Sequence, residues 1–420
     1  MTRIVAYCVL TGQDPDTAGP CQLTWDDEEA IAELAQEMAK EIATSTSPPT
    51  GIAEQELQAI LEEALASSLQ PVYSSGGVVP DTPWLAESTG RIPRDSDNAA
   101  TDENFYRSCI IIEPEPLNSP EDWRNWRRGR LVLKVVEDYS FEDRRWETLV
   151  VAGERISRQS LVSYGSVLCW ERPWMYFREW MRRSSEKLAA LDDKSFIEAF
   201  FSFVVTSHGD CDHEYRVPCI SYGGIEKVAE NEADVFHIMQ QGTRNVAAAI
   251  CHGVRGPDLW PALAADFNVW MTTRPDLWPS RPTTTTRWEP PIPVPETGAE
   301  SILHSLPPEV LLQILALVPH GGLWRLMTTS RRILIHLLTL LDEVLWYHVH
   351  HGDLRWLLPV SSVPGEVQRA AQALGGQSMA SREFPFSTYL PVCLASDSMK
   401  NRRRMWNIAQ QFCGALERSL

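Results

Sequence analysis

Two segments between residues 306 and 346 are predicted to form helices that are apolar on nearly every side. The first, residues 309–318, has only two polar positions, Glu309 and Gln313. In the second, residues 332–346, the main polar residues follow the spacing i, i+4, i+7, i+11 and form one narrow stripe: Arg332, His336, Thr339 and Glu343. A surface helix of a globular domain normally has the opposite proportions. We therefore expect both helices to be covered on two sides, by the rest of the chain or by another protein.

Proline and glycine set the expected helix boundaries in this segment. Pro307 and Pro308 suit a first helical turn, where a backbone N–H has no intrahelical partner. Pro319, followed by two glycines, is expected to end the first helix and form a turn. A short helix over residues 323–328 and an N-cap at Thr329 or Ser330 should then lead into the last helix.

A degenerate motif runs through these three predicted helices. Its residues are Leu306, Pro307, Glu309, Leu311, Ile314, Leu315, Ser330, Arg331, Leu345 and Trp346. The motif resembles the F-box, the three-helix module that binds the small Skp adaptor of cullin-RING ubiquitin ligases, and it covers roughly a tenth of the chain. The resemblance implies adaptor contacts at Leu306, Pro307, Leu311, Ile314, Leu315, Leu334, Leu338, Leu341 and Trp346. One departure is Thr328-Thr329, where many members carry an apolar residue and a cysteine.

The resemblance also implies a function. The chain would be a non-enzymatic substrate receptor that brings an unknown protein client to a Skp adaptor and a cullin complex, so that partner subunits carry out ubiquitin transfer. A module placed behind about 280 residues of other sequence resembles the arrangement of many fungal F-box proteins. Two alternatives are that the chain binds an adaptor without joining a ligase, and that the apolar helices are ordinary core of a helical domain.

We expect an α+β fold that is mostly helical. The predicted parts are an acidic strand-plus-helices segment (1–73), a flexible connector (74–104), a Trp-rich α+β domain (105–278), a Pro/Thr-rich linker (279–300), the F-box-like domain (301–358) and a helical C-terminal extension (359–420). In the first part, residues 3–11 alternate as a strand does, and two helices should follow. Their apolar faces are Ile31, Leu34, Ala35, Met38 and Ile42, and Leu57, Ile60, Leu61 and Ala64.

The Trp-rich domain should combine strands and helices. Residues 131–136 and 146–152 are predicted strands, either a hairpin or neighbours in one sheet. Helices are predicted over 170–191, 195–205 and 230–251. The aromatic stripe of the first of these helices is expected to belong to the core: Trp174, Phe177 and Met181.

Beyond Trp346 we expect a short helix over 366–374 and a long amphipathic helix at the C-terminus. The apolar face of the long helix is Met405, Ala409, Phe412 and Leu416. This face can cover the F-box-like module or pack on the Trp-rich domain. The basic run Arg402 to Arg404 in this helix is interpreted as a solvated surface.

The net charge of −18 is concentrated near the N-terminus. Residues 1–103 hold 19 acidic and 4 basic residues, a balance of −15, whereas residues 301–420 hold 8 acidic and 11 basic residues, a balance of +3. This distribution argues against nucleic acid as a partner, because nucleic-acid binding needs clustered Lys and Arg. No segment has the length and composition of a membrane span or a secretory signal. Nine scattered cysteines suit reduced thiols, so we expect a cytoplasmic or nuclear protein.

One group of candidate metal ligands lies in the Trp-rich domain. Its members are His208, Cys211, His213 and Cys219, and four nitrogen and sulfur ligands are what tetrahedral zinc requires. The alternative is a polar loop between two elements. Dinucleotide, phosphate-loop and nucleophile-elbow motifs are missing from the sequence, so no cofactor other than this zinc is expected. The competing functional hypothesis is a zinc-dependent or thiol enzyme, with Cys211 or Cys251 as the first candidates for a nucleophile.

Overall fold

The described part of the chain is mostly helical, as expected. The computed structural model describes residues 10, 28–44, 52–73, 109–114, 131–136, 139–142, 148–151, 154–157, 167–208, 217–223, 242–266, 269–282, 306–329, 334 and 337–420. The predicted strand over 3–11, the connector 74–104 and most of the linker 279–300 lie outside these residues. The chain divides into two compact units: unit 1 contains Met1–Arg274 and Arg404–Leu420, and unit 2 is Pro275–Arg403.

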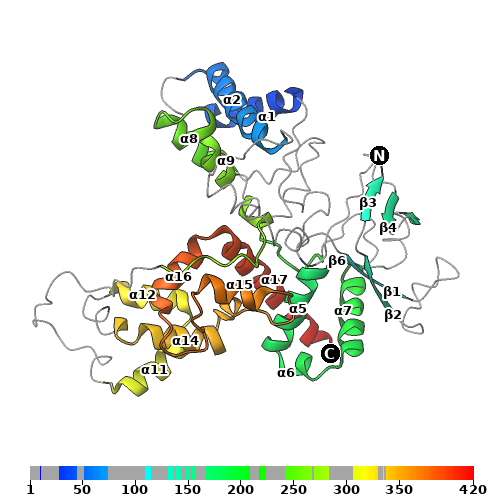
Figure 1. Ribbon diagram of the computed structural model, residues 1–420, viewed down its shortest axis with the longest axis vertical. Helices are drawn as coiled ribbons and strands as arrows, with labels where there is room; N and C mark the ends of the chain where they lie inside the picture. The colour runs from blue at the N-terminus through cyan, green and yellow to red at the C-terminus, as the bar shows by residue number, and fades with distance from the viewer. Residues whose placement is uncertain are drawn as a thin grey trace, which may run out of the picture. The chain divides into compact units, whose positions relative to one another are not determined.

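In unit 1, five helices share one apolar core (Figure 1). They are α1 (Glu28–Thr44), α2 (Glu54–Tyr73), α8 (Arg244–Cys251), the 3-10 helix η4 (Gly256–Leu259) and α9 (Trp260–Asp266). Both predicted apolar faces of α1 and α2 are buried in this core, because 3.6-residue periodicity places these residues on one side of each helix. The two N-terminal helices therefore share their core with α8 and α9, which come from the 105–278 region.

A buried carboxylate fixes the start of α8. Asp266 is 5% exposed and accepts hydrogen bonds from the backbone N–H groups of Asn245 (3.0 Å) and Val246 (2.8 Å). These N–H groups lie in the first turn of α8, where no intrahelical carbonyl can receive them. The predicted helix over 230–251 is therefore wrong in its extent: residues 230–241 are not described, and Gly242, with φ +145°, and Thr243 precede the helix.

The described strands of unit 1 form two antiparallel sheets. β1 (Cys109–Pro114) lies between β2 (Leu131–Val136) and β6 (Val167–Trp170) in one sheet. β3 (Tyr139–Glu142), β4 (Thr148–Val151) and β5 (Glu154–Ser157) form the other. The predicted strands 131–136 and 146–152 are present as β2 and β4, but the expectation that they pair is wrong. β3 intervenes along the chain and takes β4 as its hairpin partner, whereas β2 pairs with β1.

The predicted helix over 170–191 is interrupted. It consists of α5 (Glu171–Ser184) and the short α6 (Glu186–Ala189), because Ser185 adopts an extended backbone and its Oγ accepts a hydrogen bond from the Leu188 N–H at 3.2 Å. α7 (Asp193–His208) follows. The aromatic stripe of α5 is buried as expected, since Trp174, Phe177 and Met181 are at most 3% exposed.

The second half of the C-terminal helix, α17 (Asp397–Ser419), completes this aromatic core. Phe412 is fully buried, and its ring centroid lies 6.2 Å from that of Phe177 and 5.7 Å from that of Phe200. Trp406 meets Trp180 edge to face at 5.6 Å. Of the two packing partners considered for this apolar face, the Trp-rich region is therefore the one that Phe412 contacts.

Unit 2 contains the F-box-like segment and most of the C-terminal extension. Its elements are α11 (Pro308–Leu317), α12 (His320–Thr329), α14 (Leu341–His351), η6 (Arg355–Leu357), α15 (Glu366–Ala373), α16 (Phe386–Ala395) and the first residues of α17. The short helix predicted over 366–374 is present as α15. The α14 helix packs against α11, α16 and η6, so the segment 301–358 shares its core with the extension.

Two helix boundaries in the F-box-like segment differ from the sequence-based expectation. The predicted helix over 332–346 is interrupted by a turn at Thr339 and Leu340, after which α14 runs on to His351. The glycines expected to form a turn lie inside α12, which begins directly after Pro319. The carbonyl of this proline accepts the N–H groups of Gly322 (2.7 Å) and Leu323 (3.1 Å), so the first turn of α12 closes despite the glycines.

The interpretation of Arg402 to Arg404 as a solvated surface is wrong. Arg402 is fully buried in unit 2, and its guanidinium donates hydrogen bonds to the carbonyls of Pro275, Trp356 and Leu358. It also lies 2.8 Å from the buried carboxylate of Glu366. Arg404 is 5% exposed and donates to the carbonyl of Tyr222 in unit 1. Both cations are held by carbonyls that come from distant parts of the sequence.

Candidate functional site

Helix α11 carries apolar side chains on two faces. Pro307 precedes it and Pro308 occupies its first turn, while the Pro307 carbonyl accepts the Leu311 N–H at 3.0 Å. The inner face holds Leu311 and Leu315, which are 0% and 2% exposed. These two residues stabilise unit 2 itself, so in the folded unit they are not available to a partner.

The outer face of α11 presents three apolar side chains to solvent. Val310, Ile314 and Leu317 follow the spacing i, i+4, i+7, which places them along one side of the helix. Their exposed fractions are 40%, 39% and 82%. We call these three residues the α11 outer stripe. Among the described residues, the other large apolar side chains of at least comparable exposure are Tyr347, Val367 and Leu420.

Sequence reasoning found only one member of the α11 outer stripe. Ile314 is among the residues that the F-box resemblance assigns to adaptor contact, whereas Val310 and Leu317 were not singled out. The signal was available: once Leu311 and Leu315 are assigned to the core, the apolar residues Val310, Ile314 and Leu317 fall on another face of α11. Periodicity alone does not say which of two apolar faces is buried.

The other residues predicted to contact an adaptor lie in varied surroundings. Pro307 is exposed, and Leu306, Leu334 and Leu338 are half-buried. Leu341 is buried.

Trp346, also predicted to contact an adaptor, is half-buried and makes several contacts with neighbouring residues. Its indole N–H donates to the Ala380 carbonyl at 3.1 Å, His350 stacks on its ring at 4.4 Å, and Arg382 lies over it at 4.9 Å. In the described structure the exposed residues of the predicted set are therefore Pro307 and Ile314.

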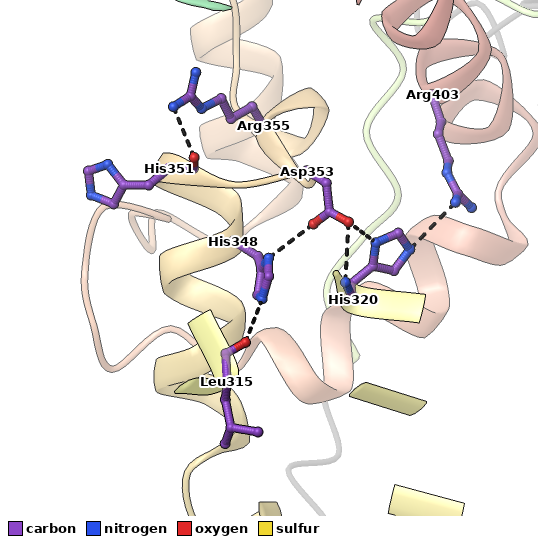
Figure 2. A network of polar contacts seen from close by, with 7 residues as sticks. All are labelled: Leu315, His320, His348, His351, Asp353, Arg355 and Arg403. Carbon is purple, nitrogen blue, oxygen red and sulfur yellow. Dashed lines mark hydrogen bonds and ion pairs between the residues drawn. The ribbon is translucent and has the colours of Figure 1, made fainter. Parts of the chain in front are cut away.

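A polar cluster lies at the C-terminal end of α11 (Figure 2). Asp353 lies just after α14, and each oxygen of its carboxylate contacts one imidazole ring. His348 Nδ1 lies 3.0 Å from Oδ1, and His320 Nδ1 lies 2.6 Å from Oδ2. On its other side the His348 ring reaches the carbonyl of Leu315, with an Nε2 to O distance of 3.3 Å. Arg403 Nη2 lies 3.5 Å from His320 Nε2. This cluster joins α11, α12, α14 and α17 within unit 2.

The protonation state of the carboxylate follows from these contacts. Burial by itself would raise the pKa of Asp353, but the hydrogen bonds from His320 and His348 hold that pKa well below its usual range. Asp353 is therefore ionised near neutral pH, and it can only accept hydrogen bonds.

Half of the predicted zinc group lies outside the described residues. His208 is the last residue of α7, Cys219 is an exposed free cysteine, and Cys211 and His213 are not described. Within the described ranges, no three His, Cys, Asp or Glu side chains are arranged to hold a metal ion. The zinc site and the thiol-enzyme hypothesis built on Cys211 stay predictions. The other candidate, Cys251, is exposed at the end of α8.

Comparison with protein-family models, with curated proteins and with solved structures finds no match to this chain. No helix in the described ranges is both long and apolar enough to cross a membrane. The argument for function therefore rests on the residues of the chain itself.

Proposed function

We propose that this chain is a non-catalytic substrate receptor that binds a Skp adaptor through the α11 outer stripe and so presents a protein client to a cullin-RING ubiquitin ligase. The observation that carries the proposal is the second apolar face of α11: Val310, Ile314 and Leu317 are exposed in the segment whose sequence resembles an F-box.

The spacing of the stripe suits recognition of a helix by a partner. Apolar side chains at i, i+4 and i+7 are the usual anchors when a helix binds an apolar surface of another protein. Burial of these three partly exposed side chains is worth on the order of 3 kcal/mol, at about 1.5–3 kcal/mol for each fully buried aliphatic side chain. That is a substantial fraction of the free energy of a micromolar complex.

The client would be held elsewhere in the chain. Trp170, Trp174 and Trp180 are buried, so these aromatic residues of unit 1 belong to its core and not to a client surface. In the described part of unit 1, the large apolar side chain with substantial exposure is the C-terminal Leu420. We therefore propose that client recognition uses polar surface or residues outside the described ranges.

The direct test measures binding of the full chain to a purified Skp adaptor by isothermal titration calorimetry. Ile314→Lys should lower the affinity at least tenfold, because it places a charge in the middle of the apolar contact. Lysine is a good helix former, so the change should leave α11 intact.

Val367→Lys is the matched control. Val367 is 49% exposed on α15, so this variant introduces the same charge at an apolar position of similar exposure. It should bind the adaptor as the unchanged chain does, and circular dichroism should show both variants folded. If the unchanged chain does not bind the adaptor, the proposal fails. Equal loss of affinity in both variants would show that the α11 outer stripe is not the contact.

A further inference from the structure

His348 is a buried histidine with an acceptor on each side of its ring. It is 3% exposed, its Nδ1 faces the Asp353 carboxylate at 3.0 Å, and its Nε2 faces the Leu315 carbonyl at 3.3 Å (Figure 2). A neutral imidazole can donate a hydrogen bond from one nitrogen only, whereas an imidazolium donates from both. Both contacts are hydrogen bonds at the same time only when His348 carries two ring protons.

The sequence explains why the Leu315 carbonyl has room for this donor. Leu315 lies in the last turn of α11, where carbonyls lack their normal partners. The residue four positions later is Pro319, which has no N–H to give. The Leu315 carbonyl accepts the Val318 N–H at 3.1 Å and can accept a second hydrogen bond from His348. A cation there is also favoured by the helix dipole, which is negative at this end.

His320 has the opposite environment. Its backbone N–H and its Nδ1 both approach Oδ2 of Asp353, at 3.2 and 2.6 Å, while its Nε2 faces the guanidinium of Arg403 at 3.5 Å. Because a guanidinium can only donate, a hydrogen bond between Arg403 and His320 requires a lone pair on His320 Nε2, and Nδ1 then carries the proton that faces Asp353. The two histidines on one carboxylate therefore face different groups on the far side of the ring, a carbonyl for His348 and a guanidinium for His320.

We propose that His348, Asp353 and His320 form a proton-dependent clasp that fastens the C-terminal end of α11 to α14. Loss of one proton from His348 leaves one N–H for two acceptors. Whichever nitrogen keeps its proton, the other becomes a lone pair that faces an oxygen. Because the Asp353 carboxylate is the stronger acceptor, Nδ1 keeps its proton and the contact with Leu315 is lost. The hydrogen bond that ties the C-terminal end of α11 to α14 is then missing, and this end is held by the packing of Leu311 and Leu315 alone.

Among the described residues, the cationic side chains near the clasp are directed at groups other than the Leu315 carbonyl. Arg403 of α17 is directed at His320, and Arg355 of η6 donates to the carbonyl of His351 at 3.0 Å (Figure 2). On α16, burial raises the pKa of the Tyr389 phenol well above its usual range and that of the Cys393 thiol to about 12, so both groups stay neutral.

Neighbouring titratable side chains on α14 are also engaged or point elsewhere. His350 Nδ1 faces the Trp346 carbonyl at 2.9 Å, and Tyr347 packs its ring against His351 at 5.1 Å. The charge of His348 therefore decides whether its ring donates to the Leu315 carbonyl as well as to Asp353.

The clasp also offers a means of regulating the α11 outer stripe, and this step rests on the proposed function. A fastened α11 presents Ile314 and Leu317 on a rigid helix, so a partner does not have to order the helix on binding. The proposed adaptor should therefore bind more tightly when His348 is protonated.

The test of the clasp itself does not involve a partner. Hydrogen exchange of the full chain, read by mass spectrometry and corrected for the intrinsic pH dependence of exchange, is followed from about pH 5.5 to about pH 8. The protection factors of peptides that cover Pro308–Leu317 should fall at least about tenfold as pH rises, because a hydrogen bond from a charged donor is lost. Peptides from α15 should not change. Equal changes in α11 and α15 would overturn the proposal.

Two further measurements separate the clasp from general effects of pH. In His348→Gln the new amide can donate to the Leu315 carbonyl at any pH, so the protection of α11 in this variant should not depend on pH. His351 is an exposed histidine of the same helix, and His351→Gln should keep the pH response. Nitrogen-15 spectra of the ten histidines in the unchanged chain need no substitution: one ring, assigned by its loss in His348→Gln, should carry two protons at about pH 5.5. A singly protonated His348 at that pH would overturn the proposal.

Adaptor affinity at about pH 6 and about pH 8 completes the experiment. A several-fold tighter complex at the lower pH, absent in His348→Gln, would support regulation of the α11 outer stripe. A pH response of α11 without adaptor binding at either pH would leave the clasp standing and overturn the proposed function. Adaptor binding without any pH response of α11 would support the proposed function and overturn the clasp.

Discussion

Replacement of Arg402 should be among the most destabilising single changes in unit 2. Its guanidinium is fully buried and donates to three carbonyls whose residues lie 44 to 127 positions away in the sequence. It also stacks over Trp278, 4.9 Å from the ring centroid, and lies 2.8 Å from the fully buried Glu366 carboxylate. One side chain thus joins the residues before α11, the segment after α14 and the start of α15.

The expected cost follows from the groups that Arg402→Met leaves behind. Removal of one partner of a buried ion pair typically costs about 3–5 kcal/mol, because the other charge stays in a poorly solvating interior. Arg402→Lys keeps the positive charge but cannot reach all three carbonyls, so it should cost less, about 1–3 kcal/mol. Arg402→Met together with Glu366→Gln should cost less than the sum of the single changes, because the double variant no longer buries an unpaired charge.

The assay is urea unfolding followed by circular dichroism, with hydrogen exchange of α15 as the local reading. Lys400→Met is the matched control, since it removes a cation from the same helix at an exposed position and should change the free energy of unfolding by at most about 0.5 kcal/mol. If Arg402→Met costs no more than Lys400→Met, the buried ion pair does not hold unit 2 together, and the reasoning fails.

Three further predictions concern other groups. The pKa of Asp353 is lowered in the folded chain, so its contribution to stability is present at neutral pH and is lost as pH falls below its ordinary value of 3.8. Asp353→Asn should lower the free energy of unfolding at pH 7 by about 1 kcal/mol, a value that allows for solvent screening of a side chain that is 39% exposed. In acid titration, this variant should lose less stability than the unchanged chain as pH falls. Phe412→Ala should cost about 3–5 kcal/mol in thermal unfolding because it empties the contact with Phe200, and a cost below about 1 kcal/mol would contradict the described packing. Iodoacetamide at about pH 8 should modify the exposed Cys219 but not Cys393, whose pKa burial raises to about 12, as peptide mapping will show.

Much of the helical structure could be predicted from local patterns. The apolar faces of α1 and α2 are buried as the 3.6-residue period indicates, and β2 and β4 lie where β-branched residues cluster. The sequence did not show which strands pair with each other. The pairing of β2 with β1, and of β4 with β3 and β5, depends on contacts that no local pattern encodes.

The candidate site shows the same division. The sequence indicated that α11 is apolar on nearly every side, but only the packing of Leu311 and Leu315 shows which face is left to solvent. The clasp was missed because His320, His348 and Asp353 come from separate elements. Pro319 was the available signal, since it removes the donor that the Leu315 carbonyl would otherwise receive.

Arg402 shows most clearly what the sequence alone could not predict. The sequence by itself determined the helix, its apolar face and the fact that Arg402 lies three residues before Met405, in register with that face. Only the tertiary structure decided that this position is buried, because the carbonyls of Pro275, Trp356 and Leu358 converge on it in the folded unit. A helical period states which side chains share a face. It carries no information about the groups that meet them, and those groups decide whether a charge is solvated or enclosed.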